Sequence, residues 1–265
     1  MLIAERQSRL KEMLSKRGIA DLDSLAAELG VSQSTIRRDI EMLEQTRLVE
    51  RTHGGVIWVG DKPASDARPY AFDQRMGFCS DAKKQIARAA RQLIQPGQTI
   101  LLDGGTTTLY FAHELQGISL QLVTNSLPIA NLFHNDDRVE LVVTGGLMYP
   151  RYGVLLGPLT EDIVGTIHAK TLVLSVAGIH EGMLYNQNQL LVSAERRMMQ
   201  QAQEVVLLAD SGKFGQQALS RLGPLSDVDI VVSDQELSGE QRKQVEQAGC
   251  KLIIASNESR SAESF

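Results

Sequence analysis

The chain has 265 residues, a length that corresponds to one or two domains. Apolar residues make up 43% and charged residues 22%, a balance typical of folded soluble proteins rather than disordered chains. Apolar runs are only a few residues long, so neither a membrane span nor a secretory signal is expected. Cys79 and Cys250 fit a reducing cytoplasm. No His or Cys spacing indicates a metal site, and no cofactor is expected.

The net charge of -5 by itself argues against a nucleic-acid partner. The charge is unevenly distributed, because residues 1–60 are neutral and residues 61–265 carry the whole acidic excess. A neutral small domain can still bind DNA through local basic clusters. Charge alone therefore leaves the partner open.

Residues 1–58 are expected to form a small helical domain. Apolar spacing predicts two helices, the second of which is capped by Asp23 and ended by Gly30. Ser32 is expected to cap a third helix. The apolar face of this third helix carries Ile36, Ile40 and Leu43.

A β-hairpin after these helices completes the order of a winged helix-turn-helix. Two short alternating runs, residues 48–51 and 56–59, flank Gly54 and Gly55 and predict that hairpin. The third helix of such a unit enters the major groove of DNA. Its groove-facing side chains would be Ser34, Thr35, Arg37 and Arg38, and those near the wing would be Arg51, Thr52 and His53.

Other interpretations of the third helix stay open from the residues alone. Adjacent arginines often lie on a solvated helix face, and Asp39 and Glu41 could neutralise them. A three-helix unit can also be a protein-interaction module that does not bind DNA.

The remaining chain is expected to form a linker at 59–74, a larger domain at 75–256 and a polar tail at 257–265. Strand-like runs alternate with helical segments in the larger domain, which predicts an α/β fold with a mainly parallel sheet. The expected strands are 99–102, 120–123, 139–143, 171–176, 204–209, 230–233 and 251–255. The expected helices lie near 86–94, 107–116, 126–134, 159–168, 192–203 and 238–248.

Four loops at the expected carboxyl ends of these strands carry small and polar residues. They are residues 103–108, 124–126, 144–146 and 210–214. Glycines allow a ligand to approach the backbone, and amides and hydroxyls at a helix N-terminus suit a phosphate or carboxylate. Taken singly, each loop is more typical of a tight turn or a helix cap. The series of four favours an anion site, with Lys213 as its only cation.

Three stretches of the N-terminal domain are distinctive, and the second and third of them are highly specific to one protein family. They are LAAELGVS at 25–32, TIRRDI at 35–40 and RTHGGV at 51–56. Together they resemble the N-terminal domain of the DeoR family of bacterial transcriptional regulators. The resemblance implies DNA binding, with Ser32 to Arg38 opening the recognition helix.

The loops of the larger domain match the DeoR C-terminal sensor domain in order and spacing. The matching runs are LDGGTTT at 102–108, VTNSLPIA at 123–130, TGG at 144–146 and LLADSGKFG at 207–215. That domain resembles sugar-phosphate isomerases of the ribose-5-phosphate isomerase type. The resemblance implies an effector whose anionic end meets the first loop and Lys213. The implied effector residues are Asp103, Gly104, Gly105, Thr106, Thr107, Thr108, Thr124, Asn125, Ser126, Gly145, Gly146 and Lys213. Arg151 is a further candidate effector residue, from its residue type and not from the resemblance.

The chain departs from the family in the segment that would meet the sugar part of an effector. Where the family usually has Gly-x-Asp/Asn-Gly-Ile, this chain has Ser175 and Ala177, so a carboxylate or amide is missing at 177. On the next helix Arg196 follows Glu195 and stands where lysine is common. Tyr149, Arg151 and Tyr185 could reshape the pocket or lie on the surface. These departures from the family pattern do not affect the residues of the expected anion site.

The expected function is that of a DNA-binding transcriptional regulator. It would repress a carbohydrate or sugar-acid catabolic operon and leave its operator when a phosphorylated sugar or related anionic metabolite binds. The expected partners are double-stranded operator DNA, this metabolite and further copies of the chain in a dimer or tetramer, because one winged helix contacts too few base pairs. No membrane partner is expected.

The alternative is a sugar-phosphate isomerase-like enzyme with an accessory helical domain. Isomerisation needs a positioned general base. Ala177 cannot serve, and no histidine lies in the four loops, although Asp103, Glu181 and Asp210 remain as possible bases. The chain is therefore expected not to be an enzyme and to have no catalytic residues.

Overall fold

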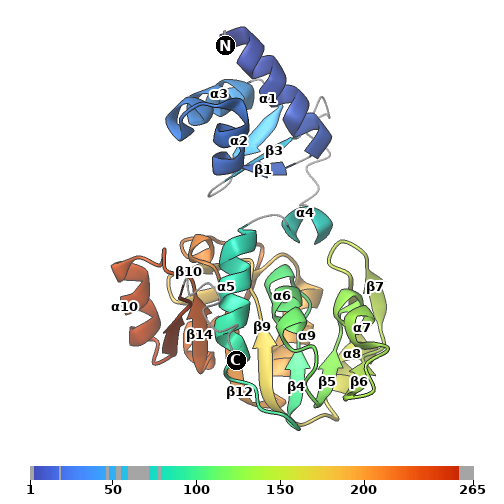
Figure 1. Cartoon of the computed structure of the whole chain (residues 1–265). Helices are drawn as coiled ribbons and strands as arrows, with labels where there is room; N and C mark the ends of the chain where they lie inside the picture. Colours follow the sequence, from blue (N-terminus) through green and yellow to red (C-terminus); the bar gives the residue numbers. More distant parts are fainter. Residues whose placement is uncertain are drawn as a thin grey trace, which may run out of the picture. The chain divides into compact units, whose positions relative to one another are not determined.

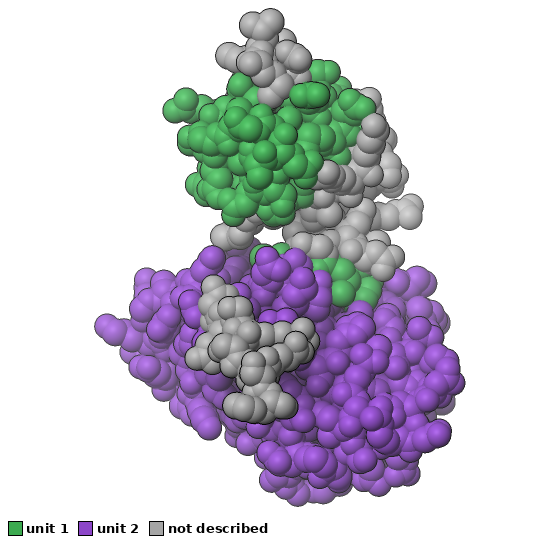
Figure 2. Space-filling model, in the orientation of Figure 1, with its two compact units in different colours: residues 1–79 green, residues 80–265 purple. Residues whose placement is uncertain are grey.

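A computed structural model describes residues 3–17, 19–45, 48–51, 55–58, 72–76 and 79–256. The chain forms two compact units, residues 1–79 and residues 80–265, which Figure 2 distinguishes by colour. The expected linker at 59–74 lies mostly outside the described residues, as does the whole tail at 257–265. None of the described helices is long and apolar enough to span a bilayer.

In the described part of the first unit, α1, α2 and α3 pack around a small antiparallel sheet (Figure 1), and a short fourth helix, α4, follows. Its strand order is β1-β3-β2, so that the expected hairpin gains a third strand, which the sequence pattern did not predict. The elements are α1 (Ile3–Arg17), β1 (Ile19–Asp21), α2 (Leu22–Leu29), α3 (Gln33–Gln45), β2 (Val49–Arg51) and β3 (Gly55–Trp58), followed by the short α4 (Phe72–Met76).

Local capping explains where α2 and α3 begin and end. The expectation that Asp23 caps α2 is wrong, because the Asp21 carboxylate accepts the Ser24 N–H at 2.7 Å. Gly30 ends α2 in the left-handed conformation, with φ of 64°. The Ser32 hydroxyl accepts the Thr35 N–H at 3.3 Å, which confirms it as the cap of α3.

A single apolar core holds these elements together. The expected buried face of α3 is confirmed, because Ile36, Ile40 and Leu43 are all buried. They pack with α1 and α2 and with the strands, through residues that include Leu10, Leu14, Leu25, Leu29, Val49 and Val56. Burial of this stripe fixes which side of α3 remains in contact with solvent.

The second unit is built on a seven-stranded parallel sheet in the order β15-β14-β12-β9-β4-β5-β6. All seven expected strands are confirmed. They are β4 (Thr99–Leu102), β5 (Leu120–Thr124), β6 (Val139–Val143), β9 (Ala169–Leu174), β12 (Ala202–Leu208), β14 (Ile230–Ser233) and β15 (Lys251–Ile254). The helices between them are α5 (Ser80–Arg91), α6 (Thr106–Glu114), α7 (Leu127–Phe133), α8 (Pro158–Val164), α9 (Gln189–Met199) and α10 (Gly239–Gln247).

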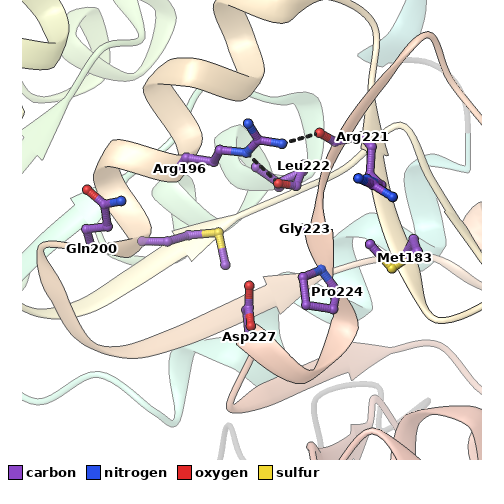
Figure 3. A pocket seen from close by; sticks show the side chains of 9 residues that line it. Met183, Arg196, Gln200, Arg221, Leu222, Gly223, Pro224 and Asp227 are labelled. Carbon is purple, nitrogen blue, oxygen red and sulfur yellow. Dashed lines mark hydrogen bonds between the residues drawn. The ribbon is translucent and has the colours of Figure 1, made fainter.

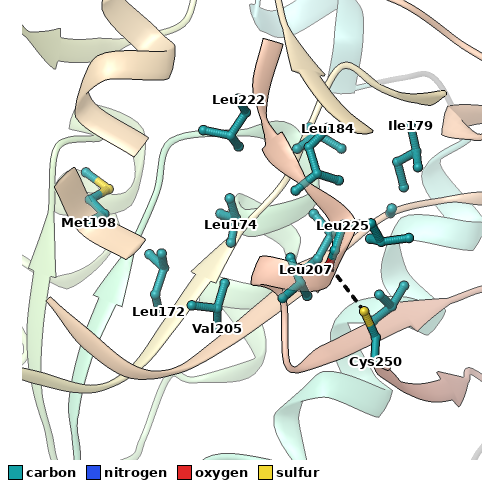
Figure 4. Packing of buried hydrophobic residues seen from close by; sticks show 14 of the residues in the cluster. Leu172, Leu174, Ile179, Leu184, Met198, Val205, Leu207, Leu222, Leu225 and Cys250 are labelled. Atoms are coloured by element: carbon teal, nitrogen blue, oxygen red, sulfur yellow. Dashed lines mark hydrogen bonds between the residues drawn. The ribbon is translucent and has the colours of Figure 1, made fainter. Parts of the chain in front are cut away.

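Alternating side chains of the sheet enter two apolar cores, one on each face. Helices α5, α6 and α7 cover the first face, where Ile100 and Leu102 are fully buried. Helices α8, α9 and α10 cover the other face, and Figure 4 shows Leu172, Leu174 and Met198 packed there. Because both faces of the central strands are covered, their inner residues are mostly apolar, and the residues after the carboxyl ends of β4, β5 and β6 are buried.

Smaller elements were not predicted, because their segments are short and broken by turns. A hairpin of β7 (Leu147–Tyr149) and β8 (Val154–Leu156) follows β6. A separate antiparallel sheet contains β10 (Gly178–His180), β11 (Met183–Asn186) and β13 (Ser220–Pro224). Two 3-10 turns, η2 (Ser211–Lys213) and η3 (Leu225–Asp227), complete the unit.

Candidate nucleic-acid interface and candidate effector site

The solvent side of α3 carries the side chains expected to face DNA. Ser34, Arg37 and Arg38 are exposed, and Thr35 is half-buried. Neither guanidinium forms a hydrogen bond or an ion pair with the parts of the chain that the structure describes. The two arginines are therefore available for a polyanionic partner.

Asp39 does not neutralise these arginines, so that part of the alternative interpretation is wrong. Its side chain is buried, with the residue 2% exposed, and accepts Arg6 Nε at 2.5 Å and a second guanidinium nitrogen at 3.0 Å. This bidentate pair ties α3 to α1. The acidic residue of the TIRRDI motif therefore orients the helix.

The wing is only partly described. Arg51 ends β2, where its backbone pairs with Val56 of β3. Thr52 and His53 lie outside the described residues. The contribution of these three residues to DNA binding stays a prediction.

Arg38 offers a direct test of the α3 surface. Because it is exposed and opposite the buried stripe, we expect Arg38→Ala to leave the fold intact and to cost about 1–3 kcal/mol of operator affinity. A gel-shift titration measures this loss. Arg9→Ala on the exposed part of α1 is the matched control, and equal operator affinity for both variants would contradict the assignment.

The polar loops of the second unit meet at the carboxyl edge of the sheet. Leu102 pairs with Thr124, and Thr124 pairs with Val143, so the next residue of each strand lies in one row. That row contains Asp103, Asn125 and Thr144, each at most 1% exposed. The expected convergence of these three loops is thus present in the structure.

The first loop leads into α6 with its backbone amides uncapped by a side chain. Gly105 is the N-cap residue and has an extended backbone, and no side chain caps the first turn. Thr106, Thr107 and Thr108 are buried, and the Thr108 hydroxyl donates to the Gly105 carbonyl at 3.0 Å. This helix N-terminus is suited to an anion.

Glycine at 104 and 105 is also required by packing within the chain. A Cβ atom on Gly104 would collide with Val154 of β8, and one on Gly105 would collide with the Ser175 hydroxyl. Gly105→Val would therefore disturb the protein itself before it could exclude a ligand. It is a poor test of phosphate binding.

Several of the expected effector residues form hydrogen bonds or turns that stabilise the fold itself. The Thr124 hydroxyl donates to the Leu102 carbonyl at 2.7 Å, and Ser126 caps α7 by accepting the Ile129 N–H at 3.4 Å. Gly145 accepts the Thr160 hydroxyl at 2.5 Å, and Gly146 adopts φ of 135° at the start of the hairpin. Asn125 differs, because neither of its side-chain polar atoms has hydrogen-bond geometry to a described residue, although its amide lies near enough to the Asp103 carboxyl to lower the pKa of that group.

Lys213 lies in η2, after β12 on the same edge of the sheet. Its side chain is half-buried and forms no hydrogen bond or ion pair with described residues. Arg151, also half-buried, lies in the turn between β7 and β8. Lys213 therefore supplies an ammonium group that is unpaired within the described chain, on the edge of the sheet where the loops converge.

Glu195 and Asn186 belong to the site although neither was named as an effector residue. Glu195, on α9, is 1% exposed and accepts a hydrogen bond from the Asn186 amide of β11. Burial, and then the nearby Asp103 carboxyl, raise the pKa of Glu195 well above its usual value. The sequence places Glu195 beside Arg196 on a helix, but nothing local shows that it faces Asp103.

Burial also raises the pKa of Asp103 to about 7, against the opposing influence of the Gly104 N–H and the Asn125 side chain. Among the described residues, Asp103 Oδ1 and Glu195 Oε2 have no hydrogen-bond partner, and the same holds for Thr144 Oγ1. The edge of the sheet thus contains a sheltered set of polar atoms whose bonding capacity is not used within the described chain.

Arg196 points away from this set, contrary to its expected place near the sugar. Its guanidinium donates to the carbonyls of Arg221 and Leu222 on β13, each at 2.7 Å. It lies beside an open hollow of about 700 Å³ between α9, β11 and β13. Figure 3 shows residues that line this hollow. The residues that line the hollow include none of the predicted effector residues. The two tyrosines that could have reshaped the pocket have partners within the chain. The Tyr185 hydroxyl accepts a hydrogen bond from the Gln217 amide, and the ring of Tyr149 stacks on that of Tyr152.

A winged helix-turn-helix unit whose α3 arginines are unpaired among the described residues, together with an α/β unit that has a sheltered polar site, defines a DNA-binding regulator of transcription. Comparison with known proteins agrees with this class. Residues 6–61 match the DeoR-like helix-turn-helix domain, and residues 79–235 match the DeoR C-terminal sensor domain. The chain belongs to the DeoR family of transcriptional regulators.

Similar proteins include both transcriptional activators and repressors. The L-fucose operon activator of Haemophilus influenzae is 32% identical over 94% of this chain and 99% of its own length. The transcriptional regulator YulB of Bacillus subtilis is 31% identical over 95% and 96%. The glycerol-3-phosphate regulon repressor of Escherichia coli is 30% identical over 87% and 90%.

Among solved structures, ribose 5-phosphate isomerase A from Methanocaldococcus jannaschii is similar to part of the chain, with a TM-score of 0.37 and 18% identity. It covers 51% of this chain and 54% of that one. The eIF2B delta subunit of Chaetomium thermophilum has a TM-score of 0.41 and 15% identity, over 57% and 54%.

Proposed function

We propose that this regulator represses a carbohydrate catabolic operon and leaves its operator when a phosphorylated sugar or related anionic metabolite binds to the second unit. The observation that carries this proposal is the sheltered edge of the sheet. There the uncapped amides of α6 lie beside Asp103, Asn125 and Glu195, whose polar atoms are partly unbonded within the described chain. The names of similar regulators refer to fucose, aga and glycerol-3-phosphate genes and support the carbohydrate class.

Within this site we assign the anionic end of the effector to residues 104–108 and Lys213. Amides at the N-terminus of α6 favour a negative charge, and the Lys213 ammonium is unpaired among the described residues. Asp103 begins this loop, and we assign it to holding the loop or a sugar hydroxyl, because its carboxylate, when ionised, would repel a phosphate. The rest of the effector would be lined or supported by the remaining expected residues, which are Thr124, Asn125, Ser126, Gly145, Gly146 and Arg151.

Operator release provides the test. Thermal shift with a set of sugar phosphates identifies an effector, because a ligand at 100 times its dissociation constant stabilises the protein by about 2.7 kcal/mol. That ligand should then release the full-length chain from operator DNA in a gel-shift experiment. A stabilising ligand that leaves the DNA complex unchanged would contradict the proposed response.

We further propose that the chain is not an enzyme. Similar full-length proteins are transcriptional regulators, and Ala177 cannot act as a base. Asp103 and Glu195 are the carboxyl groups that could move a proton, so turnover is worth measuring directly. Incubation with ribose 5-phosphate should yield no ribulose 5-phosphate above the level of a heat-treated sample.

We propose that the chain forms a homo-oligomer. A single α3 helix reads few base pairs, and helix-turn-helix proteins pair across symmetric half-sites. We propose a dimer or tetramer. Light scattering on the full chain measures the number of copies in the oligomer. A footprint on operator DNA shows whether two half-sites are bound.

The two units should also separate functionally. We expect a fragment of residues 1–60 to fold and to bind operator DNA weakly, because it lacks the dimerising unit. We expect residues 75–265 to bind effector and no DNA, in line with the two compact units. Filter binding and thermal shift measure these activities. Operator binding by the larger fragment alone would contradict the division.

A further inference from the structure

Exposed apolar side chains gather where the parallel sheet ends at β6. Six of the ten large apolar side chains that are exposed in the described chain lie there, on β6, on β7 of the following hairpin and on α8. We call this set the edge patch, and its members are Val142, Val143, Leu147, Met148, Leu159 and Ile163. A contiguous apolar surface marks a site at which another molecule binds, whereas scattered single residues do not.

Contacts within the chain hold the three parts of the edge patch side by side. The short segment 144–146 joins β6 to β7. The Thr160 hydroxyl of α8 donates to the Gly145 carbonyl at 2.5 Å, and a Cβ atom on Gly145 would lie 3.6 Å from Ile163 Cδ1. Leu159 precedes Ile163 by four residues and shares its face of α8. The edge patch is therefore one continuous surface.

The outer side of β6 also has unpaired backbone groups. β6 is the last strand of the sheet, and no described strand pairs with it on that side (Figure 1). On the inner side, the Thr144 N–H donates to the Thr124 carbonyl at 3.0 Å. Because the backbone groups of successive residues alternate between the two sides of a strand, those of Leu141 and Val143 point outward. An exposed apolar edge strand is a template for a strand of another chain.

The chain's own terminal tail and linker do not match this surface. The tail at 257–265 follows β15, which lies at the opposite end of the sheet from β6. It carries three charged side chains, and Phe265 is its one large apolar residue. The linker at 59–74 contains Pro63 and Pro69, which lack the N–H that a paired strand donates.

A second copy of the chain matches the edge patch in both geometry and charge. Two β6 strands can pair antiparallel about a two-fold axis, which places one edge patch against the other. Residues 61–265 carry the acidic excess of the chain, so two copies repel each other in general. Residues 141–150 contain no charged side chain, so two copies can meet along β6 and β7 without that repulsion.

We propose that the edge patch is the surface through which two copies of the chain associate, one patch against the other about a two-fold axis. This inference rests on the proposed homo-oligomer and assigns a surface to it. The association covers the exposed apolar side chains and brings the outward backbone groups of the two β6 strands together.

Sedimentation equilibrium of the full-length chain tests this surface with paired charge variants. One double variant combines Leu147→Glu with Leu159→Glu, and the other combines Leu147→Lys with Leu159→Lys. These two side chains are 66% and 65% exposed, so their replacement leaves the apolar cores unchanged. The lysine changes also reduce the net negative charge, so that general repulsion cannot explain a loss of association. Leu219→Glu, at a side chain that is 86% exposed outside the edge patch, is the control.

We expect the wild type and Leu219→Glu to associate with the same dissociation constant. Each double variant should weaken the association by about hundredfold or more, because like charges are then buried against each other without compensation. In a tetramer, the same loss would leave a dimer. An equimolar mixture of the two double variants should associate to within about tenfold of the wild type, because opposite charges then face each other across the two-fold axis.

Two results would overturn this assignment and leave the homo-oligomer standing. One is a double variant that associates like the wild type, and the other is a mixture that associates no more tightly than its separate components. A wild-type chain that stays monomeric at every concentration would instead overturn the proposed homo-oligomer itself. The mixture also reports on folding, because only correctly folded variants can restore the association.

Discussion

Lys213→Ala should abolish the effector response while leaving operator binding intact. The Lys213 ammonium forms no hydrogen bond or ion pair with described residues, so its removal should not affect the fold. A charged hydrogen bond to a phosphate contributes about 1.5–3 kcal/mol, and its loss would raise the effector concentration needed for release by about tenfold or more. The variant would stay on DNA at the concentration that releases the wild type.

Gel-shift titrations with and without effector measure this phenotype. Lys243→Ala removes an exposed lysine from α10 and is the matched control, which should respond like the wild type. Lys213→Arg keeps the positive charge and should restore part of the response. If Lys213→Ala leaves the operator at the wild-type effector concentration, the anionic end of the effector binds elsewhere.

The stability of the second unit should fall as the pH rises from about 5 to about 8. Burial raises the pKa of Asp103 from 3.8 to about 7, so the folded chain keeps a proton that the unfolded chain has released. Stability falls with pH wherever the folded state binds more protons. Each pH unit between 5 and the folded pKa costs about 1.4 kcal/mol, so the ionisation of Asp103 removes about 3 kcal/mol over this range. Glu195 acts in the same direction, because its pKa is also raised.

Asp103→Asn should remove the part of this dependence that comes from Asp103 and leave the part that comes from Glu195. The variant should melt close to the wild type at pH 5 and above it at pH 8, because it has no buried carboxyl to ionise at this position. Asp136→Asn is the control, since Arg138 lowers the pKa of Asp136 and that group is already ionised across this range. Thermal unfolding of the full chain measures the second unit, and an Asp103→Asn variant with the wild-type pH profile would contradict the expectation.

The periodic elements and their order could be predicted from the sequence. The seven parallel strands alternate with helices because apolar runs and helical stripes are local patterns that burial enforces. The winged helix-turn-helix followed from the stripe of Ile36, Ile40 and Leu43 and from the glycine pair. Placement of polar loops at the carboxyl ends of strands is a property of any parallel sheet, which is why the sequence already indicated that Asp103 and Asn125 lie at one edge.

Contacts between distant segments were decided by tertiary structure alone. Asp39 binds Arg6 of α1 instead of its neighbours on α3, and Glu195 of α9 faces Asp103, whereas Arg196 beside it turns to β13. The β7–β8 hairpin determines that residue 104 must be glycine. Sequence patterns show which faces are apolar, but the environment of a polar group depends on long-range packing. Burial and charge proximity therefore became visible only when the whole chain was folded.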